Sequence, residues 1–348
     1  MKRPPVGHLA HRASRHDTSG DGTGPLWAGS LTAARSPQPG SLGGRSVGYE
    51  QEMGSSDHLL STRQMAEFVA NGVLRFDALV PGDINERAVE EMARLNAERL
   101  APEGLRPPPT RTPLDYCYPP PSAIGEYLRL PEVRGIITSL VGPDPVFDHD
   151  WTHHLPAGST YLQPLHVDAV TDSVDPTFDI QLFWYPRDVA AGEGGTRFVP
   201  GTHLHRVRSS GLDRYQHIVG EEQFAGPAGT VVVFHHGLWH AGQPNPGTGD
   251  RWMHKVRLNP TRPQVRRWDT SDLDELHNPS SDHVFAQMMP DSVGQVLRTW
   301  HPWMSVTEYR NEQMQRARLW RYLSGDDRYD VDYYLTRLES RATLVADG

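Results

Sequence analysis

Between about residues 145 and 260 the chain is built from short runs of β-type residues separated by turn residues. Turn clusters such as Pro156-Ala157-Gly158 and Gly192-Glu193-Gly194-Gly195 punctuate this block. The runs with strand character are 145–155, 158–168, 178–185, 195–199, 229–236 and 251–258. So many short strands in one block favour two sheets packed face to face, as in a sandwich or jelly roll.

Helical patterns precede this block. Ser61-Thr62 is suited to cap a helix that has Met65, Phe68, Val69 and Val73 at helical spacing. A second helix is expected after Pro81-Gly82-Asp83. A proline-rich connection and a further short helix then follow, at 107–121 and about 131–141.

Helical periodicity returns in the C-terminal region, about 282–340, most clearly at 306–323 and 331–339. We expect the aromatic residues of these helices to pack on the β-core or on a second subunit. They are Trp320, Tyr322, Tyr333 and Tyr334.

The first 55 residues differ in composition from the rest. They are rich in Gly, Pro, Ser, Arg and His and show no hydrophobic periodicity, so they offer too little apolar surface to offset the entropy of ordering. We expect a disordered leader over 1–55 and a single domain over 56–348, a length ample for one buried core. Met53 is an alternative start, and the sequence does not decide between the two.

Composition excludes several classes of protein. A net charge of -9 and a pI near 6.0 argue against nucleic-acid binding, which needs a basic surface. No apolar run approaches the roughly 20 residues that span a bilayer, and the N-terminus lacks the apolar segment of a secretory signal. The single cysteine, Cys117, forms no internal disulfide and is not expected to be a nucleophile. We expect a cytoplasmic monomer or homodimer that acts on a small molecule.

A candidate metal site begins at His166-Val167-Asp168. On a strand, the period of two places His166 and Asp168 on one face and Val167 on the other. One further histidine would complete the two-histidine, one-carboxylate arrangement that leaves positions open on Fe(II). Taken alone, His-x-Asp is a weak signal, because it occurs by chance in many proteins.

A second segment strengthens this hypothesis. His240 follows a β-type run, and Arg251 stands eleven residues later, at the start of the next run. In a jelly roll, a distant strand supplies the third ligand and the returning strand carries a basic residue into the pocket. An arginine there matches the distal carboxylate of a 2-oxo acid by a bidentate fork better than a lysine does.

Three motifs resemble the phytanoyl-CoA dioxygenase family of Fe(II)/2-oxoglutarate oxygenases, over roughly residues 60–260. They are Gln163-x-x-His166-x-Asp168, then Gly194-Gly195-Thr-Arg-Phe-Val-Pro200-Gly201-Thr202-His203, then His240-Ala-Gly-x-x-Asn245 with Arg251. The resemblance implies a mainly β fold with flanking helices around a double-stranded β-helix (jelly roll, cupin-like) core. It also implies Fe(II) on His166, Asp168 and His240, with 2-oxoglutarate and O2 as co-substrates and succinate and CO2 as co-products.

Other histidines compete for the metal. His235 and His236 lie in a strand where one faces inward, but neither precedes the Ala-Gly-x-x-Asn turn, so His240 is preferred. His203 is expected to be a structural or pocket-lining residue. The run from Asp148 to His154 contains three histidines (His149, His153 and His154) and invites a second metal, but an ordinary polar strand is preferred.

Three other residues are candidates for the pocket. Gln163 could bond an iron ligand or 2-oxoglutarate, and Lys255 could assist an anionic group of the co-substrate or substrate, since strand alternation puts it on the face of Arg251. Lysine is rare in this chain, which has only Lys2 and Lys255 among 34 basic residues. A solvent-facing Lys255 near the strand end is nevertheless the preferred expectation. Asn245 is expected to shape the turn after His240.

The resemblance implies a dioxygenase with no catalytic residue beyond the metal centre. In related halogenating enzymes the carboxylate ligand is missing, so Asp168 favours hydroxylation, desaturation or oxidative cyclisation. The substrate is expected to be a natural-product intermediate, selected by loops 169–177 and 202–225. Asp172 and Asp175 of the first loop are expected to be solvated rather than to bind the substrate. The alternatives are a metal-dependent isomerase or epimerase on the same fold, and a non-catalytic cupin-like metal-binding protein.

Overall fold

A computed structural model describes residues 58–100, 107–169, 175–207, 209–212, 214, 217–277, 292–327 and 329. The expected disorder of the leader, its boundary with the domain, and the helix at 331–339 lie outside these residues and stay predictions. Within the part of the chain that is described, no helix is both long and apolar enough to cross a membrane.

Two antiparallel sheets form the core. The larger has the order β1-β6-β3-β8-β2, and the smaller has the order β5-β4-β7. The strands are β1 (Val73–Phe76), β2 (Val146–Leu155), β3 (Ile180–Tyr185), β4 (Arg197–Phe198), β5 (Glu222–Gln223), β6 (Thr230–His235), β7 (His240–Ala241) and β8 (Arg251–Asn259). The mainly β jelly-roll core with flanking helices is confirmed.

Five of the six predicted strands are present, and the one expected at 158–168 is wrong. That segment makes only isolated bridges, at Ser159 and His166. Pro164 lies inside it and has no N–H to donate, so a continuous ladder is not formed there.

Alternation along the strands sorts the apolar side chains into two layers. On β6, Val231 and Val233 join the core beneath the helices. Val232 and Phe234 join a second cluster with Met253 of β8, which also holds Phe198 of the smaller sheet. The second cluster therefore fills the space between the sheets, where the candidate ligands also lie.

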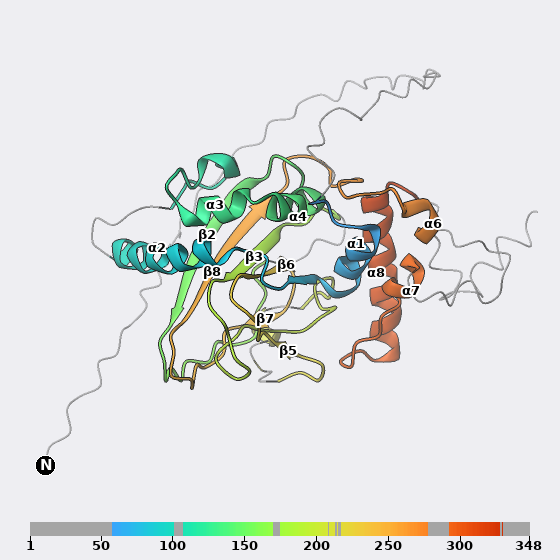
Figure 1. Cartoon of the computed structure of the whole chain (residues 1–348). Coiled ribbons are helices and arrows are strands. Elements are labelled where there is room, and N and C mark those ends of the chain that lie inside the picture. The colour runs from blue at the N-terminus through green and yellow to red at the C-terminus, as the bar shows by residue number, and fades with distance from the viewer. Residues whose placement is uncertain are drawn as a thin grey trace, which may run out of the picture. The chain divides into compact units, whose positions relative to one another are not determined.

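Helices α2 (Gly82–Leu100), α3 (Ala123–Arg129) and α4 (Pro131–Val141) lie over one face of the larger sheet (Figure 1). The described part of the proline-rich connection before α3 contains the 3-10 turn Leu114–Tyr116 and an isolated bridge from Pro113 to Val146. Trp184 of β3 donates its indole N–H to Asn85 of α2 at 3.0 Å, which ties this layer to the sheet. The helices predicted near 82 and at 131–141 are confirmed, whereas α3 was not predicted.

Helix α1 (Thr62–Asn71) begins at Ser61, which forms a capping box with Gln64. It ends at Gly72, whose φ of 71° is the left-handed conformation that glycine adopts without strain. Val73 was expected on this helix but starts β1 instead, because the chain turns at Gly72 and pairs with β6.

Helix α8 (Val306–Ser324) confirms the helix predicted at 306–323. It packs against α1 and the short helix α7 (Val293–Leu297), and α6 (Leu273–His277) packs against α1 and α7 (Figure 1). Helix α5 (Ser209–Leu212) is a single turn. Trp320 is fully buried beside Trp268, and Tyr322 accepts a hydrogen bond from the Gln264 N–H, so both aromatics pack against this chain. Tyr333 and Tyr334 lie outside the described residues.

Candidate functional site

The smaller sheet brings His166 and His240 together. The backbone N–H of each donates to the carbonyl of the other at 3.0 Å, which makes them a directly opposed antiparallel pair. Side chains of such a pair project from the same face of the sheet. Their rings accordingly lie 4.5 Å apart between centroids.

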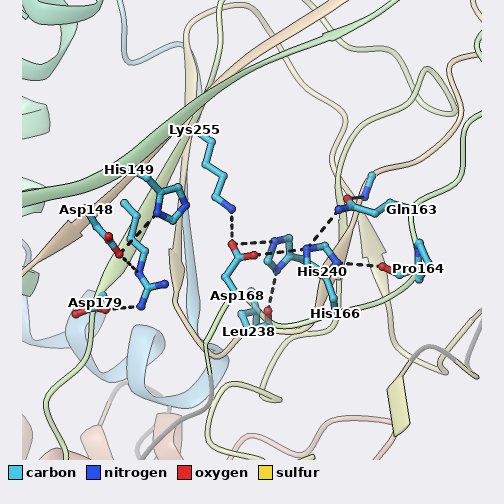
Figure 2. A network of polar contacts seen from close by, with 12 residues as sticks. Asp148, His149, Gln163, Pro164, His166, Asp168, Asp179, Leu238, His240 and Lys255 are labelled. Carbon is cyan, nitrogen blue, oxygen red and sulfur yellow. Dashed lines mark hydrogen bonds and ion pairs between the residues drawn. The ribbon is translucent and has the colours of Figure 1, made fainter. Parts of the chain in front are cut away.

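Asp168 lies beside the two imidazoles, and its carboxylate faces both of them (Figure 2). Its Oδ1 is 3.6 Å from Nε2 of His166, and its Oδ2 is 3.6 Å from Nε2 of His240. One ligand atom from each of the three residues lies within 4.8 Å of the other two, and no other such group of metal-ligand side chains occurs among the described residues. The three residues predicted as metal ligands therefore converge on one point.

Backbone carbonyls set the orientation of both imidazoles. Nδ1 of His166 lies 3.0 Å from the Pro164 carbonyl, and Nδ1 of His240 lies 2.9 Å from the Leu238 carbonyl. A carbonyl only accepts, so Nδ1 carries the proton in each ring and Nε2 keeps its lone pair. Both Nε2 atoms face Asp168, and this is the tautomer in which a histidine binds a metal.

The protonation states also suit a metal. Burial lowers the pKa of His240 to about 3, although Asp168 opposes that change, so its ring is neutral near pH 7. Burial raises the pKa of Asp168, but contacts with His166, His240 and Lys255 outweigh burial and hold that pKa well below its ordinary value. The site thus presents two aligned imidazoles and one carboxylate, and neither His240 nor Asp168 has to lose a proton before a metal binds.

Lys255 lies inside this site. Its residue is 8% exposed, and its ammonium donates to Oδ2 of Asp168 (Figure 2). The preferred expectation of a solvent-facing lysine is wrong, because β8 is a central strand of the larger sheet whose odd-numbered residues face the smaller sheet. The ammonium also lies 5.7 Å from the centroid of the Phe183 ring.

Arg251 is a buried cation with unused donors. It is 7% exposed, and its Nε and Nη1 have no hydrogen-bond partner among the described residues. Burial lowers the pKa of Arg251, with an opposing contribution from Tyr185. A guanidinium that keeps unpaired N–H groups away from water is costly unless a ligand accepts from them.

His166, His240 and Arg251 line one cavity. Gln163 also lines it: its Oε1 accepts from the Gly242 N–H at 2.8 Å, and its amide nitrogen is 3.5 Å from Nε2 of His166. The cavity wall is formed by His153, Gln163, His166, Phe183, Thr196, His240, Gly242, Arg251, Met253 and Lys255.

The histidines that compete with His240 in the sequence lie away from the ligand cluster. His235 packs against Phe178 and His203, with ring centroids 5.0 and 4.9 Å away. His236 uses Nδ1 to accept from the Asp179 N–H at 3.0 Å. These buried rings pack in the core or hydrogen-bond the backbone, and within the described part of the chain they join no metal-ligand group.

The histidine-rich run of β2 forms no second metal site among the described residues. His154 pairs with Asp250 at 2.8 Å and stacks on Trp252. His153, in contrast, faces the cavity, and burial lowers its pKa to about 3, with further lowering by nearby Arg251 and Lys255. The pairing of His153 with Met253 across β2 and β8 explains its place, and this register could not be read from the sequence.

Asn245 shapes the turn after β7, as expected. Its side-chain amide donates to the carbonyls of Leu155 and Gly249, and its Oδ1 accepts from the Gly247 N–H. It is absent from the cavity wall. Thr196 and Phe183 are cavity residues that the sequence analysis missed, since nothing in their local sequence marks them.

The residues present fit an Fe(II) centre with 2-oxoglutarate. Two neutral imidazoles and a carboxylate form a donor set that leaves positions open on Fe(II). The unpaired guanidinium in the same cavity supplies the donors that a carboxylate of a 2-oxo acid would accept.

Comparison with solved structures finds distant likenesses. EctD from S. alaskensis is 16% identical over 60% of this chain and 80% of that chain, with a TM-score of 0.46. HygX from Streptomyces hygroscopicus, with nickel and 2-oxoglutarate bound, is 15% identical over 62% and 94%, with a TM-score of 0.44. AviO1 from Streptomyces viridochromogenes Tue57 is 19% identical over 60% and 97%, with a TM-score of 0.44. Likenesses this distant carry no weight in the assignment.

The sequence itself gives the decisive match. No curated protein matches the chain. The model of the phytanoyl-CoA dioxygenase family, however, matches residues 68–253, which is more than half of the chain and includes all three candidate ligands and Arg251. The chain belongs to the phytanoyl-CoA dioxygenase family, whose members are oxygenases that use Fe(II), 2-oxoglutarate and O2.

Proposed function

We propose that this protein is an Fe(II)/2-oxoglutarate-dependent dioxygenase that oxidises a small molecule, with iron held by His166, Asp168 and His240. The observation that carries the proposal is the buried guanidinium of Arg251, whose unpaired Nε and Nη1 lie in the cavity lined by His166 and His240, the two imidazoles that face Asp168. An isomerase or a metal-storing module needs the ligands but has no use for this arginine.

Each residue has a distinct task. His166 and His240 present Nε2, because backbone carbonyls hold the proton on Nδ1. Arg251 binds the C5 carboxylate of 2-oxoglutarate, and Gln163 braces His166 from the Gly242 backbone. When bound, the iron with its co-substrates supplies the oxidising chemistry, which converts 2-oxoglutarate to succinate and CO2.

The proposed outcome is hydroxylation, desaturation or oxidative cyclisation, because Asp168 occupies the ligand position that halogenating relatives leave to a halide. We propose a natural-product intermediate as the substrate. Part of the candidate specificity loop, residues 170–174, lies outside the described residues, and Asp175 beyond it is exposed and caps the Thr177 N–H.

Anaerobic titration tests the proposal. Fe(II) and 2-oxoglutarate added to the full chain are expected to give the visible charge-transfer band of the metal chelate. Asp168→Ala should abolish metal binding and the band, whereas the matched control Asp175→Ala, which removes an exposed acid, should keep both. A normal band in Asp168→Ala would show that the ligands are misassigned.

A further inference from the structure

Strand β8 carries three charged side chains toward the smaller sheet, in the order Arg251, Lys255, Arg257, with Met253 between the first two. Strands rise about 3.4 Å per residue, so the backbone positions of Arg251 and Lys255 are about 13 Å apart. A 2-oxoglutarate held by Arg251 and the metal would occupy the Arg251 side. Lys255, which contacts Asp168, lies farther along the strand and remains available to another ligand.

The three cations differ in their counter-ions. Arg257 has two, Asp179 at 2.5 Å and Asp148 at 3.3 Å (Figure 2). Arg251 has none among the described residues, and 2-oxoglutarate would supply one. Lys255 has Asp168 as its counter-ion, and no second one in the part of the chain that the structure describes.

Metal binding leaves Lys255 short of negative charge. Fe(II) adds two positive charges to the carboxylate of Asp168, while 2-oxoglutarate brings two negative ones, of which Arg251 offsets one. Asp168 offsets one charge of the metal, and the second carboxylate of 2-oxoglutarate offsets the other. The buried ammonium of Lys255 then has no negative charge left to balance it, which favours an anionic ligand beside it.

An aromatic surface lies next to this cation. Trp151 of β2 is directly opposite Lys255 in the antiparallel register, so both side chains project from the same face of the sheet. Lys255 is buried, whereas Trp151 is 60% exposed, an unusual state for so large an apolar side chain. The Trp151 ring also lies next to His153 of the cavity wall, with 6.3 Å between the ring centroids, so it offers an exposed, flat apolar face beside the cavity.

Resting on the proposed function, we propose that Lys255 and Trp151 form the substrate subsite and select a small carboxylic acid. The carboxylate pairs with Lys255 beside the iron, and the apolar or aromatic body of the acid lies on the indole of Trp151. The substrate is thus an anion held on the side of the metal opposite Arg251.

The test uses the full chain loaded with Zn(II) and 2-oxoglutarate, which is diamagnetic and does not turn over. Benzoate, phenylacetate and indole-3-acetate are compared with their primary amides by saturation-transfer NMR and calorimetry. At least one acid is expected to bind about 10- to 100-fold more tightly than its amide, as for a hydrogen bond to a charged group, without displacing 2-oxoglutarate. Equal binding, no binding, or binding only with loss of 2-oxoglutarate would overturn the proposal.

Variants assign the preference to residues. Lys255→Met should remove the preference of acid over amide, Lys255→Arg should keep it, and Arg187→Met, which removes an exposed cation, should leave it unchanged. Trp151→Ala should weaken acid and amide alike. A preference that survives in Lys255→Met refutes the subsite. Failure of the wild-type chain to bind Zn(II) and 2-oxoglutarate would instead refute the proposed function, so the two failures are separable.

Discussion

Replacing Arg251 by methionine removes the guanidinium but keeps an unbranched side chain of comparable length. In the wild type this group is 7% exposed and keeps Nε and Nη1 free of partners within the described residues. Its pairing with a carboxylate would be desolvated. Loss of one partner from such a pair costs about 2–5 kcal/mol, which corresponds to about 30-fold to several-thousand-fold in the dissociation constant of 2-oxoglutarate.

The same change should not destabilise the ligand-free protein. Each buried N–H without a partner costs about 1–3 kcal/mol, and the variant no longer buries these donors. The midpoint of urea unfolding without ligands should therefore stay or rise, while the stabilisation given by 2-oxoglutarate should disappear. Opposite signs for apo stability and co-substrate affinity distinguish a ligand-binding arginine from one that merely supports the fold.

Calorimetry at saturating metal measures the affinity, with the dissociation constant of the metal determined separately. Arg262→Met, which removes a half-exposed arginine just beyond β8, is the matched control and should change neither value. A 2-oxoglutarate affinity within about threefold of wild type in Arg251→Met, with metal binding intact, would refute the anchor. Equal losses of metal and 2-oxoglutarate affinity would point to misfolding.

Three further predictions concern the fold. Gly195→Ala should lower the free energy of unfolding by about 1–3 kcal/mol, because a Cβ there would lie 1.8 Å from the Phe224 carbonyl oxygen. Gly82→Ala is the control: its Cβ would have no atom within 4 Å, so it should leave the urea titration unchanged. Ser61→Ala should cost about 1 kcal/mol in thermal unfolding, since it removes the capping box of α1; no change would mean that this cap is not formed in solution. Burial raises the pKa of the Cys117 thiol to about 11, so its reaction with a disulfide reagent should be slow at pH 8 and accelerate toward pH 11. The free energy of unfolding should fall as the pH rises between about 9 and 11, because the unfolded chain loses this proton first. Fast reaction of the folded chain at pH 8 would contradict this burial.

Most of the larger sheet was predictable because its strands are long enough to show alternation. The runs that became β2, β3, β6 and β8 each carry apolar side chains toward the helices or toward the smaller sheet. Strands β5 and β7 have two residues each, too few for any periodicity to appear. Their existence depends on the pairing of β4 with segments distant in the sequence.

Neighbouring residues encode part of the site. Their spacing alone predicts that His166 and Asp168 share a face. The turn after His240, with Arg251 at the start of the next strand, indicates the third ligand and the arginine. The choice of His240 over His235 was a preference, and the structure explains it by a backbone pair: His240 opposes His166, whereas His235 opposes Ile180 in the larger sheet.

The strand-rich core, the flanking helices and the donor types available for iron were predictable, because these follow from periodicity and side-chain chemistry within short segments. Three features of the site appear only in the folded chain: Lys255 is buried against Asp168, His153 faces the cavity, and Nε and Nη1 of Arg251 lack a partner among the described residues. The physical reason is that burial and pairing depend on cross-strand register and on which sheet covers which face. Those contacts join residues far apart in the sequence, 87 positions for Lys255 and Asp168, and no local pattern predicts them.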